Sequence, residues 1–215
     1  MKKLLFALCM ICSTILSTWA QEEESISPFL FGEYKEAIVF MKDMSRVRGK
    51  LNLYRPTGEF YFIDEQDKNK IKILSQPEEV TMIRFGNRIF LPLEKGAVEV
   101  LSSEPLLYVQ YKASIQDKGK KVGYGGTSSL VNVKSYSSNR SGTGVVSDPL
   151  KLVVGHLYNV YYIGKKKKEI NSMKQLLKYY SKHKETLEKY IEENDIKFEN
   201  APQIMQLVQY AHSLK

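Results

Sequence analysis

Short apolar segments separated by turn residues at close spacing constrain the fold of this chain more than any other feature. The clearest pair lies in GKLNLYRPTGEFYFID, residues 49–64, where apolar residues alternate on both sides of Pro56-Thr57-Gly58. Pro56 fixes a backbone angle suited to a turn and Gly58 tolerates angles that other residues avoid, so the segment predicts a β-hairpin. Spacings this short leave no room for crossover helices, and the sheet is therefore expected to be antiparallel.

Further strands are expected on both sides of that hairpin, each bounded by glycine, proline or charged turn residues. The predicted segments are 70–74, 80–85, 88–93, 97–101, 106–115, 151–154 and 156–163. Four consecutive lysines, 165–168, are expected to end the β region as a solvated turn.

The period of the apolar residues changes to a helical one after residue 172. Ser172 and Gln175 form a potential capping box, a second short helix is marked by 187–191, and Asn200 is placed to cap a third over 201–214. Together these patterns predict an α+β protein, with an antiparallel β-meander, either a sandwich or an open barrel-like sheet, followed by about three short C-terminal helices. The helices are expected to dock on the sheet; the alternative is that the third presents an apolar face to a partner. That face comprises Ile204, Leu207, Val208 and Leu214.

The first twenty residues have the pattern of a secretory signal peptide. Lys2 and Lys3 precede an uncharged run, Ala20 provides a small residue for cleavage, and polar residues follow at once. The run is too short for a transmembrane anchor, so we expect export across the inner membrane to a periplasmic or extracellular location. Cleavage would leave 195 residues without cysteine, which excludes disulfides and thiolate sites, and would lower the formal net charge from +8 to +6. That modest excess and the expected export both disfavour a nucleic-acid partner.

Four regions are therefore expected along the chain. Residues 1–20 form the signal peptide, 21–33 a polar leader, 34–168 an antiparallel β domain, and 169–215 the C-terminal helices. The β domain contains a long loop rich in glycine and serine, 117–147. Loops of this length in a compact domain are usually either functional or disordered.

The loop contains GKKVGYGGTSS, residues 119–129, which invites comparison with a phosphate-binding loop. Such loops need a buried parallel strand before them and a helix after them. Here both flanking segments alternate like antiparallel strands, and the lysines precede the glycines. Nucleotide binding is therefore disfavoured.

Cationic and aromatic residues in the same loop suggest a different role, an adaptable surface for a glycan, an acidic polymer or another envelope protein. Aromatic rings offer stacking faces and lysines offer electrostatic attraction. The candidate ligand-binding residues are Lys120, Lys121, Tyr124, Lys134, Tyr136 and Arg140. A purely structural loop is the competing interpretation, and tyrosines of 106–115 and 156–163 are expected to serve packing or to form an aromatic stripe.

Four segments together resemble a family of small secreted proteins from Bacteroidetes-type bacteria. They are GKLNLYRPTGEFYFID, VTMIRFGNRIFLPL, YGGTSS and INSMKQLLKYY. The family has no assigned enzymatic activity, cofactor or binding residues. The resemblance therefore implies only an envelope location and a β-rich body with a helical end.

Catalytic and metal signatures are weak. The three histidines are separated in sequence, and Asp64-Glu65-Gln66-Asp67 lacks the further oxygens of a calcium loop. Glu99 is a nominal carboxylate for glycoside hydrolysis, although an outward-facing partner for Lys112 or Arg84 is the simpler interpretation. We expect no cofactor and no metal. A non-catalytic binding or interaction module is favoured; a glycan-directed hydrolase with carboxylates from separate strands, and an accessory protein using its C-terminal helices, stay open.

Overall fold

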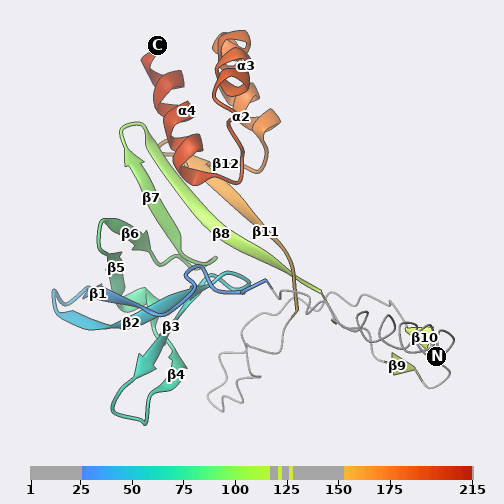
Figure 1. The fold of residues 1–215 in the computed structure, drawn as a ribbon. Helices are drawn as coiled ribbons and strands as arrows, with labels where there is room; N and C mark the ends of the chain where they lie inside the picture. Colours follow the sequence, from blue (N-terminus) through green and yellow to red (C-terminus); the bar gives the residue numbers. More distant parts are fainter. Residues whose placement is uncertain (1–25, 117–120, 123–125, 128–152, 215) are drawn as a thin grey trace, which may run out of the picture.

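The computed structural model describes residues 26–116, 121–122, 126–127 and 153–214 (Figure 1). Its main element is a sheet of ten antiparallel strands, followed by the C-terminal helices, so the predicted α+β class and antiparallel sheet are confirmed. The strands of this sheet are β1 (Lys35–Met41), β2 (Arg46–Tyr54), β3 (Glu59–Asp64), β4 (Lys70–Ile73), β5 (Val80–Phe85), β6 (Arg88–Leu91), β7 (Val98–Ser103), β8 (Leu106–Gln116), β11 (Val153–Ile163) and β12 (Lys168–Ile170).

The strand order is not a simple meander. Strands β1 to β4 pair in sequence, and so do β5 to β8 followed by β11 and β12, but β5 lies beside β1 and not beside β4. The chain therefore returns from the β4 edge to the middle of the sheet, through the short 3₁₀ helix η1 (Pro77–Glu79). Strand β12 begins with the last of the four lysines, so the β region extends one strand beyond its predicted end.

Alternation along β8 defines two faces of the sheet. Leu107, Val109 and Tyr111 point to the inner face, which carries the hydrophobic core, whereas Tyr108 and Gln110 point to the outer face. The inner face carries two buried clusters: one under the helices, and one enclosed by the N-terminal strands that includes Phe31, Leu53, Ile83 and Phe90. Tyr111 contacts both clusters, so it marks their junction.

The N-terminal part of the sheet curls until the β2–β3 turn meets the β6–β7 loop. The Ala97 N–H donates to the Gly58 carbonyl at 2.9 Å. Gly58 has a φ of 75°, and a Cβ at this position would lie 2.7 Å from the Cα of Gly96. Glycine at position 58 is therefore required both by the backbone angle and by the close approach of the two segments.

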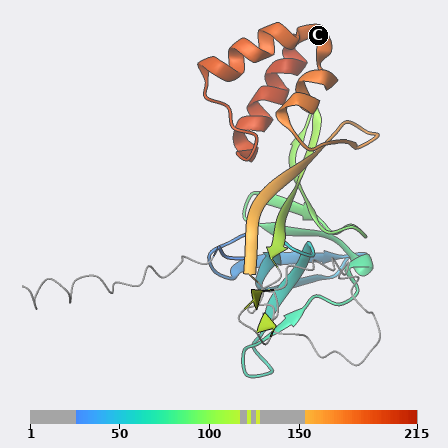
Figure 2. The ribbon, with the colours of Figure 1, turned by 90° about the vertical axis from the view of Figure 1, so that its right-hand side faces the viewer.

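The helices α2 (Met173–Tyr179), α3 (Lys184–Glu193) and α4 (Ala201–Ser213), with the 3₁₀ helix η3 (Ser181–His183), pack together at one end of the sheet (Figure 2). The Ser172 hydroxyl accepts from the Gln175 N–H, and the Asn200 side chain accepts from the Gln203 N–H, as the capping patterns predict. Ile204, Leu207 and Val208 are buried inside the chain. The alternative in which these three side chains face a partner is therefore wrong.

A second, two-stranded sheet consists of β9 (Lys121–Val122) and β10 (Gly126–Thr127). A phosphate-binding loop follows a parallel strand and leads into a helix. Here β8 is antiparallel to its neighbours and Thr127 lies in a strand, as the sequence predicts. Within the described part of the chain, no helix is both long enough and apolar enough to cross a membrane.

Candidate binding site

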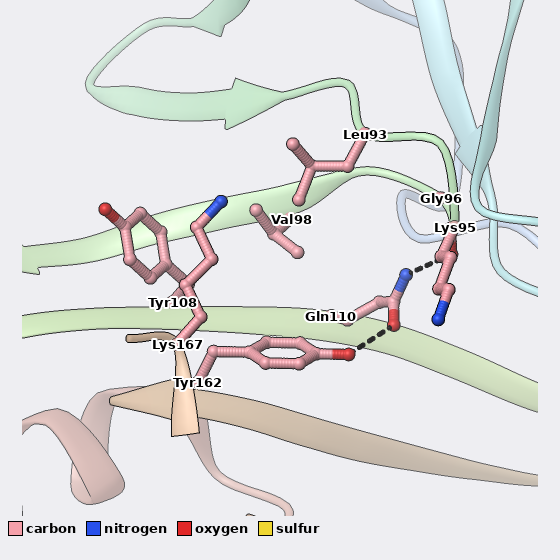
Figure 3. Close-up of a pocket in the computed structure, with 8 residues that line it drawn as sticks. All are labelled: Leu93, Lys95, Gly96, Val98, Tyr108, Gln110, Tyr162 and Lys167. Atoms are coloured by element: carbon pink, nitrogen blue, oxygen red, sulfur yellow. Dashed lines mark hydrogen bonds between the residues drawn. The ribbon is translucent and has the colours of Figure 1, made fainter. Parts of the chain in front are cut away.

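A small hollow of about 140 Å³ lies on the outer face, where β7, β8 and β11 meet two loops (Figure 3). The β6–β7 loop and the turn before β12 close its two sides. The lining residues are Leu93, Lys95, Gly96, Val98, Tyr108, Gln110, Tyr162 and Lys167. This volume is smaller than the several hundred Å³ typical of sites for drug-sized ligands, so the hollow suits one small chemical unit.

Hydrogen bonds fix the polar floor of the hollow. Gln110 is only 3% exposed, and its Nε2 donates to the Lys95 carbonyl at 2.7 Å. Its Oε1 accepts from the Tyr162 hydroxyl at 3.1 Å (Figure 3). Because both ends of the buried amide have partners, Gln110 orients the Tyr162 ring and the β6–β7 loop.

Two aromatic rings and two ammonium groups give the hollow its chemical character. Tyr162 and Tyr108 are directly opposite each other on β11 and β8. The Lys167 Nζ lies 5.6 Å from the centroid of the Tyr108 ring, within the range of a cation–π contact. Burial, followed by the nearby charge of Glu169, raises the pKa of Tyr162 above its ordinary value, so its hydroxyl stays a neutral donor at physiological pH.

The arrangement presents aromatic faces, an amide and cations, but no carboxylate belongs to the lining residues that the structure describes. Aromatic faces stack on the apolar faces of small rings, and ammonium groups bind acidic substituents. The hollow is thus suited to binding a small polar or acidic unit, and the part of its lining that the structure describes does not contain the pair of carboxylates that glycoside hydrolysis requires.

Glu99, the nominal hydrolytic carboxylate, belongs to a separate polar cluster on the inner face. It is 5% exposed and accepts two hydrogen bonds from Arg88, at 2.6 Å from Nε and 2.7 Å from Nη2. The Tyr111 hydroxyl donates to the same carboxylate at 2.6 Å. The predicted outward orientation of Glu99, with Lys112 or Arg84 as its partner, is therefore wrong: the partner is Arg88, and the carboxylate is buried.

This cluster lies at the junction of the two hydrophobic cores. The Arg88 guanidinium lies 5.0 Å from the centroid of Phe31 and 5.2 Å from that of Phe90. Burial alone would lower the pKa of Arg88, but hydrogen bonding and charge from Glu99 raise it above its ordinary value. Burial, and then the charge of Glu99, raises the pKa of Tyr111. Arg88 therefore stays charged and Tyr111 neutral, and the cluster lies between the two cores, both of which Tyr111 contacts.

A serine and a histidine that are far apart in sequence also meet. The Ser114 Oγ lies 2.7 Å from Nδ1 of His156 and accepts from the His156 backbone N–H at 2.9 Å. The strand register shifts between Val154 and Leu157, so His156 occupies a β-bulge opposite β8. In the described residues no carboxylate is hydrogen-bonded to this imidazole. The Ser114 hydroxyl has a structural role, because it accepts from the His156 N–H in the bulge.

The carboxylates of the acidic turn between β3 and β4 pair with a lysine of β4. The Lys72 Nζ lies 2.7 Å from Asp64 and 2.9 Å from Asp67, and its hydrogen bond lowers the pKa of each carboxyl. Asp64 also accepts from the Gln66 N–H, as a turn-forming aspartate does. Among the residues that the structure describes, no group of three or more His, Cys, Asp and Glu side chains is placed to hold a metal ion.

Only one of the predicted ligand-binding residues falls within the described part of the chain. Lys121 lies in β9, whereas Lys120, Tyr124, Lys134, Tyr136 and Arg140 lie outside the described residues. The sequence predicts that the tyrosines of β8 and β11 serve packing or form an aromatic stripe, but it does not connect them with the lysine turn. The available signal was that a turn of four lysines directly follows a tyrosine-rich strand.

No family model matches this sequence, and neither a curated protein nor a solved structure matches it. The resemblance to a family of secreted envelope proteins therefore stays a prediction from the quoted motifs.

Proposed function

We propose that this chain is an exported, non-catalytic binding protein of the cell envelope, and that its outer-face hollow binds one acidic sugar unit of a glycan. The observation that carries the proposal is the convergence of Tyr108, Tyr162 and Lys167 over a hydrogen-bonded amide floor. A sugar ring offers an apolar face to tyrosine and hydroxyl groups to the lysines, and an acidic substituent pairs with an ammonium group.

Binding is favoured over glycoside hydrolysis by the positions of the acidic groups. Glu99 is held by Arg88 and Tyr111 on the inner face, on the opposite side of the sheet from the hollow. The described lining of the hollow contributes cations and neutral groups to a bound sugar. A general acid and a nucleophile or base would both have to come from elsewhere.

A glycan array with the chain beginning at Gln21 tests this proposal. We expect binding to acidic glycans in preference to their neutral counterparts. Tyr108→Ala and Lys167→Gln should each weaken that binding about tenfold, which corresponds to the loss of one charge-assisted or stacking contact.

Two matched variants provide the controls. Tyr158→Ala removes a partly exposed tyrosine of the same strand as Tyr162, and Lys166→Gln removes a lysine of the same turn as Lys167, but neither residue lines the hollow. Both should bind like the unmodified chain. Equal losses in the control and test variants, or a preference for neutral glycans, would show that the hollow is not the acidic-sugar site.

The expected export is a separate part of the proposal. It predicts that the protein recovered from the envelope fraction begins at Gln21, after loss of the twenty-residue signal peptide. N-terminal sequencing of that protein is the measurement, and an intact Met1 would contradict it.

A further inference from the structure

The tip of the β1–β2 hairpin exposes apolar side chains that the fold does not use. Met44 in the turn is 89% exposed, and Val47 at the start of β2 is 55% exposed. Figure 1 shows this hairpin projecting from the body of the sheet, with the turn at its far end. Isolated exposed apolar residues are common, but two of them at a projecting tip form a surface that a partner can reach first.

The backbone conformation of the turn at position 44 disfavours methionine. Met44 has a φ of 69°, in the left-handed region that favours glycine. The turn is well defined, because the Met44 N–H donates to the Met41 carbonyl at 3.1 Å and the Asp43 carboxylate accepts from the Ser45 N–H at 2.9 Å. A large apolar side chain is thus held in an unfavourable conformation and is mostly exposed, which suggests a role outside the chain's own stability.

Cations lie beside these apolar side chains along the tip. Arg46 and Arg48 lie on one face of β2, directly opposite Phe40 and Ile38 of β1, whereas Val47 lies opposite Val39 and points to the other face. The Arg46 guanidinium lies 5.2 Å from the centroid of the Phe40 ring. All three of Lys42, Arg46 and Arg48 are exposed.

Among the described residues, acidic groups lie in the turn, further along the hairpin and in η1. Asp43 lies in the turn, where its carboxylate is already bonded to a backbone N–H, and Glu36 lies opposite Lys50 further along the hairpin. Glu78 and Glu79 belong to the neighbouring η1, and the backbone carbonyl of Glu79 accepts from the Lys42 N–H. The tip itself, from Lys42 to Arg48, therefore carries a net positive charge.

We propose that the β1–β2 tip docks on a membrane surface that contains anionic lipids. Met44 and Val47 enter the boundary between headgroups and acyl chains, and Lys42, Arg46 and Arg48 contact the lipid phosphates. This combination of apolar and cationic side chains is the one that interfacial membrane-binding segments use. An acidic polymer would pair with the cations but would gain nothing from Met44, so the methionine favours a lipid surface.

Vesicle co-sedimentation tests this proposal, with the chain beginning at Gln21 so that the signal peptide does not contribute. The vesicles contain equal parts of phosphatidylglycerol and phosphatidylcholine, and are compared with phosphatidylcholine alone. We expect preferential, salt-sensitive partition to the anionic vesicles. Met44→Ser should reduce partition about tenfold, through lost apolar burial. Arg46→Gln and Arg48→Gln should each reduce it about fivefold.

Met44→Gly separates the proposed docking from folding. Glycine accepts the left-handed φ, so this variant should unfold at the same or a higher urea concentration than the unmodified chain while losing partition to the vesicles. The matched control is Ile71→Ser, which removes a 48% exposed apolar side chain from the edge strand β4 and should leave partition unchanged.

Three outcomes would overturn the proposal. They are equal partition to anionic and neutral vesicles, equal losses in Met44→Ser and Ile71→Ser, and binding to soluble polyglutamate that matches binding to the vesicles and survives Met44→Ser. The last outcome would assign the tip to acidic polymers. None of them bears on the acidic-sugar hollow, whose lining residues are different.

Discussion

The buried cluster at the junction of the two cores makes a quantitative prediction for Glu99→Gln. The substitution keeps the size of the side chain but removes the charge that accepts two hydrogen bonds from Arg88 and one from Tyr111. Loss of one partner of a fully buried ion pair costs about 3 to 5 kcal/mol, and because Arg88 is 38% exposed we expect the lower end, about 3 kcal/mol. With a urea dependence of about 2 kcal/mol per molar, the unfolding midpoint should fall by about 1.5 M.

Urea unfolding followed by circular dichroism measures this shift. Glu188→Gln is the matched control, because its carboxylate pairs with Lys184 on the exposed surface of α3 and should contribute less than about 0.5 kcal/mol. Replacement of both Arg88 and Glu99 by apolar residues should restore part of the loss, since no buried charge is then left without a partner. If Glu99→Gln and Glu188→Gln shift the midpoint equally, the cluster does not join the cores.

Two further predictions concern the sheet. Burial raises the pKa of Tyr161 from its ordinary value of 10 to about 12, and the Tyr161 hydroxyl donates to the Phe198 carbonyl. The neutral hydroxyl therefore stabilises the fold fully below pH 10, and this stabilisation is lost as the pH rises towards 12. In Tyr161→Phe, the loss of stability between pH 10 and pH 12 should be smaller by about 2 to 3 kcal/mol, as measured by urea unfolding at several pH values. If the loss of stability at alkaline pH is unchanged, Tyr161 is not the group that causes it. Gly58→Ala should destabilise the fold by more than about 2 kcal/mol, because the added Cβ would meet Gly96. Gly86→Ala is the control: Gly86 has a φ of 57° but open space around it, so this substitution should cost about 1 kcal/mol. Equal effects of the two substitutions on thermal unfolding would show that the contact with Gly96 is unimportant.

Local signals in the sequence were sufficient for the hairpin and the helix ends. The alternation on both sides of Pro56-Thr57-Gly58 matches the observed pairing of Leu51 with Phe62 and Leu53 with Phe60. The caps at Ser172 and Asn200 are likewise made by neighbours three residues away. Such contacts depend on the chain within a few residues, where propensity and spacing carry information.

Contacts between distant segments could not be predicted in this way. Alternation shows that Glu99 and Arg88 each lie on one face of a strand, but it does not show that the curled sheet buries that face. The pairing of β1 with β5 has no local signal, because it follows from packing of the whole N-terminal core. The hollow depends on the same kind of contact, since Lys167 reaches Tyr108 only after β11 has paired with β8.

The central functional claim, that the hollow binds an acidic sugar unit, is tested most directly by an NMR titration of the ¹⁵N-labelled chain beginning at Gln21. D-glucuronate is the probe and D-glucose the neutral comparison. The account predicts saturable amide shifts at Tyr108, Gln110, Tyr162 and Lys167 with glucuronate, and much smaller ones with glucose. Amides of the hollow that do not move with glucuronate, or that move equally with both sugars, would contradict it.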